Sequence, residues 1–154
     1  MWRHVTHGTG AGRLGVLRLP SPAITMTDLD AVLAANQRFY DAFEASDMDV
    51  MSDVWSHDAS VACTHPGWTT LHGWAEVASS WFALFQQPSP LQFILTALDA
   101  RIVGQLAWVT LDENLIGAGS GPGQTVAAVN IFQQDGDGWR MVCHHGSAVA
   151  SSND

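Results

Sequence analysis

The side chains best suited to chemistry are histidines near the ends of two predicted strands. His65 closes the alternating stretch DASVACTH (58–65), and His145 lies in WRMVCHHGS (139–147). Imidazole exchanges protons near neutral pH, as enolisation or cyclisation of a carbonyl compound requires. Either histidine could act as a general acid or base at the mouth of a pocket. A hydrogen-bonded structural histidine is the alternative for each.

Glu113 is a third candidate acid or base. It shares one face of a predicted strand with Val109 and Leu111. A carboxyl group inside an apolar pocket has a raised pKa and can exchange protons near neutral pH. The alternative is that the strand reaches solvent at this point, where Asp112 and Asn114 flank Glu113.

Other polar or amphipathic side chains interrupt apolar surfaces and could orient a ligand. Asn36 lies on an apolar helix face and Asn130 on an apolar strand face, where each could bind a ligand or satisfy a buried backbone group. Tyr40, the single tyrosine, is either an oxyanion donor or a polar group at the edge of the core. Trp68 follows the Pro66-Gly67 turn, and we expect it at the pocket rim or at a dimer interface.

Two cysteine–histidine pairs raise the question of a metal site. Cys63 and His65 are two residues apart, as are Cys143 and His145, so each pair shares one strand face. All four are of types that bind zinc, but flat strands hold such ligands apart, so we favour no metal. A disulfide between the cysteines is not expected in a reducing compartment. The sequence contains no phosphate-binding loop, dinucleotide fingerprint or nucleophile elbow, and we predict no cofactor.

The composition indicates one acidic globular domain. The chain has 154 residues, of which 47% are hydrophobic and 14% charged. Six arginines and no lysine stand against fifteen acids, so the net charge is −9, which disfavours nucleic acid and membrane partners. The apolar runs are too short to span a bilayer. With two cysteines and no recognisable export signal, we expect a cytoplasmic protein.

Residues 1–25 differ from the rest of the chain, with three arginines, four glycines, two prolines and no periodicity. We interpret them as a disordered leader or as the product of a start codon placed too early. Thr27 is the predicted N-cap of the first helix, with Asp30 as its reciprocal partner. The folded domain is therefore expected over residues 26–148, followed by a flexible tail over 149–154.

The apolar periodicity predicts three helices. The first spans 29–46, the second is a short segment that Asp49 caps and that ends near Trp55, and the third spans 74–85. One strand, 58–65, precedes the third helix. Four long strands follow, at 91–103, 106–119, 125–134 and 139–149, with glycine-rich turns between them. The connections are too short for crossover helices, so these strands should form an antiparallel meander. The predicted class is α+β, with three helices packed on one face of a curved antiparallel sheet.

Four segments carry a resemblance to a known family. They are NQRFYDAFEASDMDVMSDVWSHDASV (36–61), LHGWAEVASSW (71–81), AWVTLDENL (107–115) and GWRMVCHHGS (138–147). Over about residues 27–147 the chain resembles the NTF2-like superfamily, and within it the SnoaL-like, ketosteroid isomerase-like domains. It looks closest to the branch that also contains the association domain of calmodulin-dependent kinase. Relatives there often carry His-X-His on the last strand, where this chain has Cys143 and His145.

The resemblance implies a conical, cystatin-like fold that encloses a pocket, and frequently a homodimer. Members include isomerases, polyketide cyclases, dehydratases and non-catalytic binding or assembly domains, so the fold alone does not choose an activity. We expect a small, mostly apolar ligand and proton-transfer chemistry of the isomerase, cyclase or dehydratase kind, without a cofactor. The alternative is a non-catalytic ligand-binding or dimeric assembly domain. Tryptophan-rich strands should leave an apolar outer sheet face through which two copies associate.

Overall fold

Helix α1 (Asp28–Ala45) begins at the predicted cap in the computed structural model, which describes residues 27–87, 91–117, 123–136 and 138–151. The Thr27 hydroxyl accepts a hydrogen bond from the Asp30 backbone N–H, and the Asp30 carboxylate accepts one from Thr27 N–H. Ser46, in the left-handed conformation with φ of 51°, ends the helix. The capping box predicted from the sequence is therefore confirmed. The predicted leader, residues 1–25, lies outside the described residues.

The two remaining helices lie where the sequence predicts them. Helix α2 spans Met48–Val54, and its N-cap is Asp47, whose carboxylate accepts from the Val50 N–H. The prediction that Asp49 caps this helix is wrong, because the turn at Ser46 leaves Asp47 extended and places Asp49 inside the first turn. Helix α3 spans Trp74–Phe85, as predicted. None of the helices in the described ranges is both long and apolar enough to cross a bilayer.

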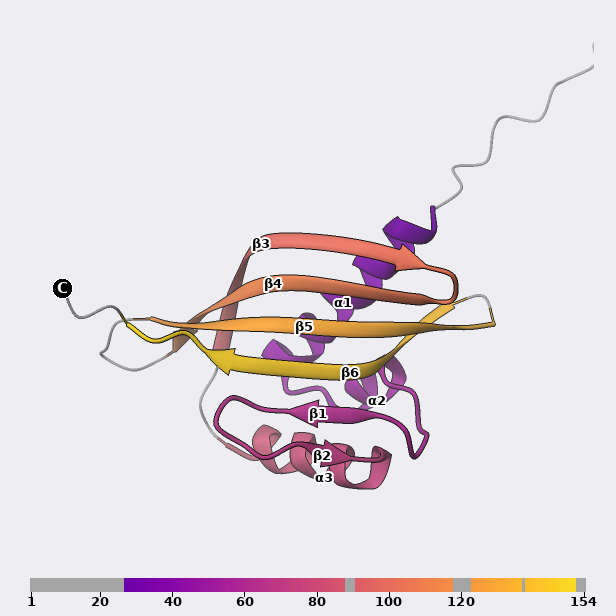
Figure 1. Cartoon of the computed structure of the whole chain (residues 1–154). Coiled ribbons are helices and arrows are strands. Elements are labelled where there is room, and N and C mark those ends of the chain that lie inside the picture. Colours follow the sequence, from indigo (N-terminus) through magenta and orange to yellow (C-terminus); the bar gives the residue numbers. More distant parts are fainter. Residues whose placement is uncertain (1–26, 88–90, 118–122, 137, 152–154) are drawn as a thin grey trace, which may run out of the picture.

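Six strands form one sheet in the order β2-β1-β6-β5-β4-β3 (Figure 1). The long strands β3 (Leu91–Val103), β4 (Leu106–Gly117), β5 (Gln124–Asp135) and β6 (Gly138–Ala148) make the predicted antiparallel meander. The short strand β1 (Ala62–Thr64) pairs parallel with β6 and antiparallel with β2 (Leu71–His72). The sheet is therefore mixed. A parallel pair needs a long connection, and here β2, α3 and the strands β3 to β5 lie between β1 and β6 along the chain.

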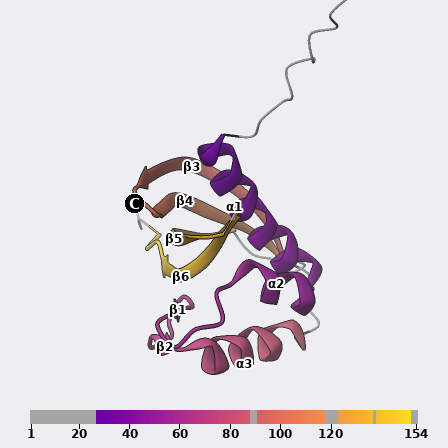
Figure 2. The same cartoon turned by 90° about the vertical axis from the view of Figure 1, so that its right-hand side faces the viewer.

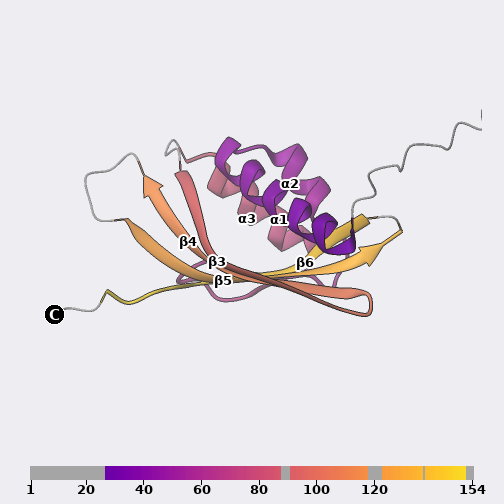
Figure 3. The ribbon, with the colours of Figure 1, turned by 90° about the horizontal axis from the view of Figure 1, so that it is seen from above.

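All three helices lie on one face of the sheet, and the opposite face is left open by the described residues (Figure 3). Seen from the side, the strands β3 to β6 curve around α1, and α3 lies beyond the short strands β1 and β2 (Figure 2). The α+β architecture predicted from the sequence is confirmed.

Two irregularities change which side chains face the helices. On β6, Val142 is an extra residue, because Phe132 pairs with Met141 and Ile131 pairs with Cys143. On β3, Ala97 and Leu98 bulge between Thr96 and Asp99, and Ala97 has a positive φ of 53°. A bulge shifts the alternation of side chains by one residue. Beyond Val142, the residues of β6 that face inward are therefore one position later than simple alternation predicts.

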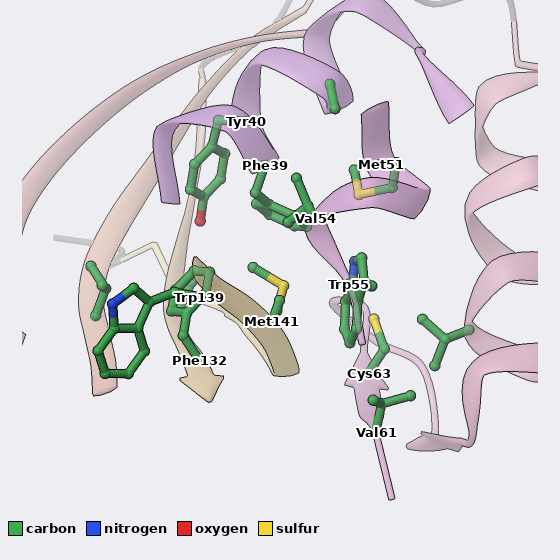
Figure 4. Packing of buried hydrophobic residues seen from close by; sticks show 14 of the residues in the cluster. Phe39, Tyr40, Met51, Val54, Trp55, Val61, Cys63, Phe132, Trp139 and Met141 are labelled. Atoms are coloured by element: carbon green, nitrogen blue, oxygen red, sulfur yellow. The ribbon is translucent and has the colours of Figure 1, made fainter. Parts of the chain in front are cut away.

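The core fills the space between α1, α2 and the sheet (Figure 4). Phe39 and Tyr40 project from α1 toward Phe132 and Met141 on the strands. Phe39 is fully buried, and burying such a side chain stabilises a fold by about 2 kcal/mol. Its ring also contacts Tyr40 and Trp81 edge-on, at centroid distances of 4.9 and 5.4 Å. Aromatic packing thus helps to determine the distance between α1 and the sheet.

The capping box gives a test of the helix that carries Asn36 and Tyr40. Thr27→Ala removes the acceptor for the Asp30 N–H and should lower the free energy of unfolding by about 1 kcal/mol. Thr27→Ser keeps the hydroxyl and should behave as the wild type. Urea unfolding followed by circular dichroism measures both. Equal stability of Thr27→Ala and the wild type would contradict a stabilising cap.

Candidate functional site

Five polar side chains meet in the interior between α1 and the sheet. Each is at most 4% exposed, and they come from α1, β4, β5 and β6. They are Asn36, Tyr40, Glu113, Asn130 and His144. Four of them belong to the set proposed from the sequence, since the periodicity of α1, β4 and β5 directs them inward. We call these five residues the polar network.

The hydrogen bonds of the polar network run in one direction. Tyr40 Oη donates its single hydrogen to Glu113 Oε1 at 2.6 Å, so it accepts from Asn130 Nδ2 at 3.1 Å. Asn130 Nδ2 also donates to Asn36 Oδ1 at 2.9 Å. Asn130 Oδ1 lies 2.6 Å from His144 Nδ1 and can only accept, so the imidazole donates. A continuous chain of donors therefore leads from His144 through Asn130 and Tyr40 to Glu113.

Glu113 is the member of the network suited to titrate near neutral pH. Burial raises the pKa of its carboxyl to about 7, although the hydrogen bond from Tyr40 opposes this shift. Burial, followed by the nearby charge of Glu113, raises the pKa of Tyr40 well above its ordinary value. The phenol therefore keeps its proton and stays a donor, while Glu113 exists in both protonation states around pH 7.

His144 is a neutral imidazole. Burial, followed by the neighbouring His65 and His145, lowers its pKa to about 3. Because Nδ1 carries the hydrogen donated to Asn130, the neutral ring has its lone pair on Nε2. This ring packs against Phe39 in a tilted arrangement, with centroids 4.9 Å apart.

His65 is also buried and neutral, at the end of β1. Its Nε2 lies 2.9 Å from Ser80 Oγ, and Ser80 donates its hydrogen to the Val77 carbonyl at 2.7 Å. His65 Nε2 must therefore donate to Ser80, which leaves the lone pair on Nδ1. Burial lowers the pKa of His65 to about 4. The ring packs edge-on against Trp81 at 4.7 Å, so His65 lies beside the polar network and is not hydrogen-bonded to it.

The remaining proposed residues lie at the surface. Trp68 is 46% exposed, contacts the His65 ring edge-on at 4.9 Å, and borders a surface hollow of about 510 Å³ beside α3. His145 is exposed on the open face of the sheet, where it borders another hollow with Asp112 and Val129. His144 occupies the inward position instead, because the bulge at Val142 reverses the alternation.

Neither His144 nor Ser80 was among the residues proposed from the sequence. A bulge leaves no signature in the residue types of β6, and a serine inside a helix is most often structural. One feature of the sequence bears on this question. Trp139 and Met141 alternate as inward-facing residues, whereas in Cys143-His144-His145 either the central residue or the two flanking residues could face inward.

The two cysteine–histidine pairs lie on opposite faces of the sheet. Cys63 and His65 are buried on the inner face, with Cys63 Sγ 3.8 Å from His65 Nε2. Cys143 pairs with Ala62 across the sheet and His145 is exposed, so the four side chains do not converge. In the part of the chain that the structure describes, no group of three or more histidine, cysteine or acidic side chains is placed to hold a metal ion. Both cysteines are free thiols.

The architecture, a curved mixed sheet with three helices on one face, is that of the NTF2-like, cystatin-like proteins. The SnoaL-like domain family model matches residues 32–151. The chain therefore belongs to the SnoaL-like family.

Two solved structures share both fold and sequence with this chain. A Streptomyces avermitilis protein, proposed to be a dehydratase of the NTF2-like family, is 35% identical with a TM-score of 0.75, over 80% of this chain and 97% of that one. A Thiobacillus denitrificans protein, proposed to be a calcium/calmodulin-dependent protein kinase type II association domain, is 36% identical with a TM-score of 0.71, over 77% and 94%.

A curated relative is considerably longer than this chain. The F-box protein SKIP8 of Arabidopsis thaliana is 27% identical over 119 residues, which are 77% of this chain and 50% of the relative. The chain thus spans about half the length of that protein.

The raised pKa of Glu113 makes stability depend on pH. The carboxyl ionises near 4.5 in the unfolded chain and near 7 in the folded one, so between these values the folded state binds more protons. Stability from this group is full below pH 4.5 and is lost as the pH rises through 7. Glu113→Gln cannot ionise and removes this loss.

We therefore expect the unfolding free energy of Glu113→Gln, relative to wild type, to rise by on the order of 2 kcal/mol across that window. Urea unfolding at a series of pH values measures the difference. The histidine titrations occur in both proteins and cancel. A difference that does not change with pH would show that Glu113 ionises normally in the fold.

Proposed function

We propose that the chain binds a small, mostly apolar carbonyl compound and moves a proton on it, with Glu113 as the general acid or base. The observation that carries this proposal is the one-directional hydrogen-bond chain that ends on Glu113, a buried carboxyl with a pKa raised to about 7. A base of this pKa is half ionised at neutral pH, which favours proton transfer in both directions.

The polar network suits a reaction through an enolate. The Glu113 carboxylate takes a proton from the carbon next to the ligand carbonyl, and the electron pair of that C–H bond moves onto the carbonyl oxygen. Once Glu113 is neutral, it accepts a weaker hydrogen bond from Tyr40. The phenol, still held by Asn130, can then donate to the developing oxyanion.

The fate of the proton defines the reaction. Isomerisation results if Glu113 returns it to a different carbon of the ligand. Dehydration results if a hydroxyl group two carbons from the carbonyl leaves and takes the proton from Glu113, which forms water and a carbon–carbon double bond. The 35% identical Streptomyces avermitilis protein, proposed to be a dehydratase, supports this second outcome.

Apolar walls and a hollow suggest how such a ligand reaches the network. A hollow of about 270 Å³ lies between the ends of α1 and α3 and the start of β3, bordered by Phe43, Phe85 and Leu91. Phe43 packs edge-on against Phe93 at 4.8 Å, and Phe93 against Tyr40 at 5.4 Å. These rings separate the hollow from Tyr40, so a ligand entering here displaces Phe43 or Phe93.

Deuterium exchange tests the proton transfer without knowledge of the natural substrate. We expect the wild-type protein to accelerate exchange of the α-protons of 2-tetralone in D₂O, measured by proton NMR. The rate should rise with an apparent pKa near 7 as Glu113 ionises. Glu113→Gln should lower it by about 100-fold or more, because the base is lost.

Asp112→Asn is the matched control. It removes the adjacent carboxyl, which lies on the open face of β4, and should leave the exchange rate unchanged. Exchange at the buffer rate in the presence of wild-type protein would contradict the enzyme proposal and favour the non-catalytic alternative.

A homodimer is the second proposal, and the open face of the sheet supports it. Trp108 and Ile116 on β4 and Ile94 on β3 expose apolar side chains there. Large apolar side chains exposed on one sheet face favour burial against a second surface. The 36% identical Thiobacillus denitrificans protein, proposed to be an association domain, supports an assembly role for this branch of the family.

We expect a dimer in analytical ultracentrifugation at micromolar concentration. Trp108→Glu should shift it to monomer, because a twofold interface would bring two buried carboxylates together. Phe82→Glu, an equally severe change on the exposed face of α3, should remain dimeric. A monomeric wild type would contradict the proposal.

A further inference from the structure

The indole N–H of Trp81 has no hydrogen-bond partner among the described residues, although the side chain is fully buried. Five aromatic rings surround it, at centroid distances between 4.7 and 6.1 Å: Phe39, Phe43, His65, Phe85 and His144. A buried donor without an acceptor is energetically unfavourable, and native interiors rarely contain one. The surroundings of Trp81 therefore call for an acceptor that the described chain does not supply.

Each of the two neighbouring imidazoles has a nitrogen lone pair that could accept a hydrogen bond. His65 uses Nε2 toward Ser80 and His144 uses Nδ1 toward Asn130, which leaves lone pairs on His65 Nδ1 and His144 Nε2. Neither of these nitrogens forms a hydrogen bond with a described residue. Their rings lie 4.7 and 6.1 Å from the Trp81 ring. One donor and two acceptors are thus gathered around a single ring system.

A hydroxyl group or a water molecule has the donor and acceptor that this set of nitrogens requires. Its oxygen accepts from the Trp81 N–H, and its hydrogen goes to one imidazole lone pair. A carbonyl oxygen would satisfy the indole and leave both lone pairs unused. A cation is disfavoured, because burial already lowers the pKa of both imidazoles and the indole presents a positive hydrogen.

We infer that Trp81 Nε1, with His65 and His144, forms a subsite that binds a hydroxyl group of the ligand. This inference rests on the proposed ligand site and narrows its substrate class to hydroxylated, mostly apolar carbonyl compounds. Trp81 is then a residue that determines specificity. Trp55, whose buried N–H also has no partner among the described residues, packs against Trp74, and no ring contact with His65 or His144 is found within the described part of the chain.

Two probes of the same shape test the subsite. We expect wild-type protein to bind 2-naphthol about tenfold more tightly than 2-methylnaphthalene in isothermal titration calorimetry, as one added hydrogen bond implies. Trp81→Phe should abolish this preference, so that the two probes bind this variant with equal affinity. Trp55→Phe should keep the preference. A wild type that binds the two probes equally, or binds neither, overturns the inference, as does a preference that survives in Trp81→Phe.

A second measurement does not depend on the variant folding. A crystal structure of the wild-type chain with 2-naphthol should place the naphthol oxygen within hydrogen-bond distance of Trp81 Nε1. Electron density without an oxygen there overturns the inference. The deuterium exchange of 2-tetralone reports on Glu113 alone, so a failed hydroxyl subsite and a failed proton-transfer function give different results.

Discussion

The carboxamide of Asn130 is the constraint on which the interior of this domain depends. It accepts from His144 on β6 and donates to Asn36 and Tyr40 on α1, so three of its hydrogen-bonding positions are used without water. An aspartate could not donate, and a leucine would remove these partners of Asn36 and His144 and one of the two hydrogen bonds of Tyr40. The same bonds that hold α1 on the sheet also orient Tyr40 toward Glu113. The same hydrogen bonds therefore stabilise the packing of α1 on the sheet and orient the polar side chains of the candidate site.

Most of the fold could be predicted from local sequence patterns. The Thr27–Asp30 capping box, the third helix and the four-stranded meander follow from short-range rules of capping, periodicity and turn chemistry, and the structure confirms them. The parallel pairing of β1 with β6 could not be predicted in this way. It joins segments about eighty residues apart, and the residue pattern of neither strand indicates the strand with which it pairs.

The composition of the candidate site could be predicted only in part, for the same reason. Asn36, Tyr40, Glu113 and Asn130 interrupt regular apolar faces, so their inward orientation follows from periodicity. His144 faces inward because of the bulge at Val142, and the residue types of β6 do not indicate where a bulge lies. The structure also changes the significance of burial. The sequence leaves open whether Glu113 lies in an apolar pocket or reaches solvent, and its burial is what raises the pKa of this carboxyl.

The hydrogen bonds of the network join residues that are far apart along the chain. Tyr40 and Glu113 are separated by 73 positions, and Asn36 and Asn130 by 94. Closing loops of this length is entropically costly and happens late in the folding of β-rich domains. A fragment that lacks α1 or the final hairpin cannot assemble the whole network, because α1 supplies Asn36 and Tyr40 and the hairpin supplies Asn130 and His144. The complete polar network is therefore a property of the native state alone.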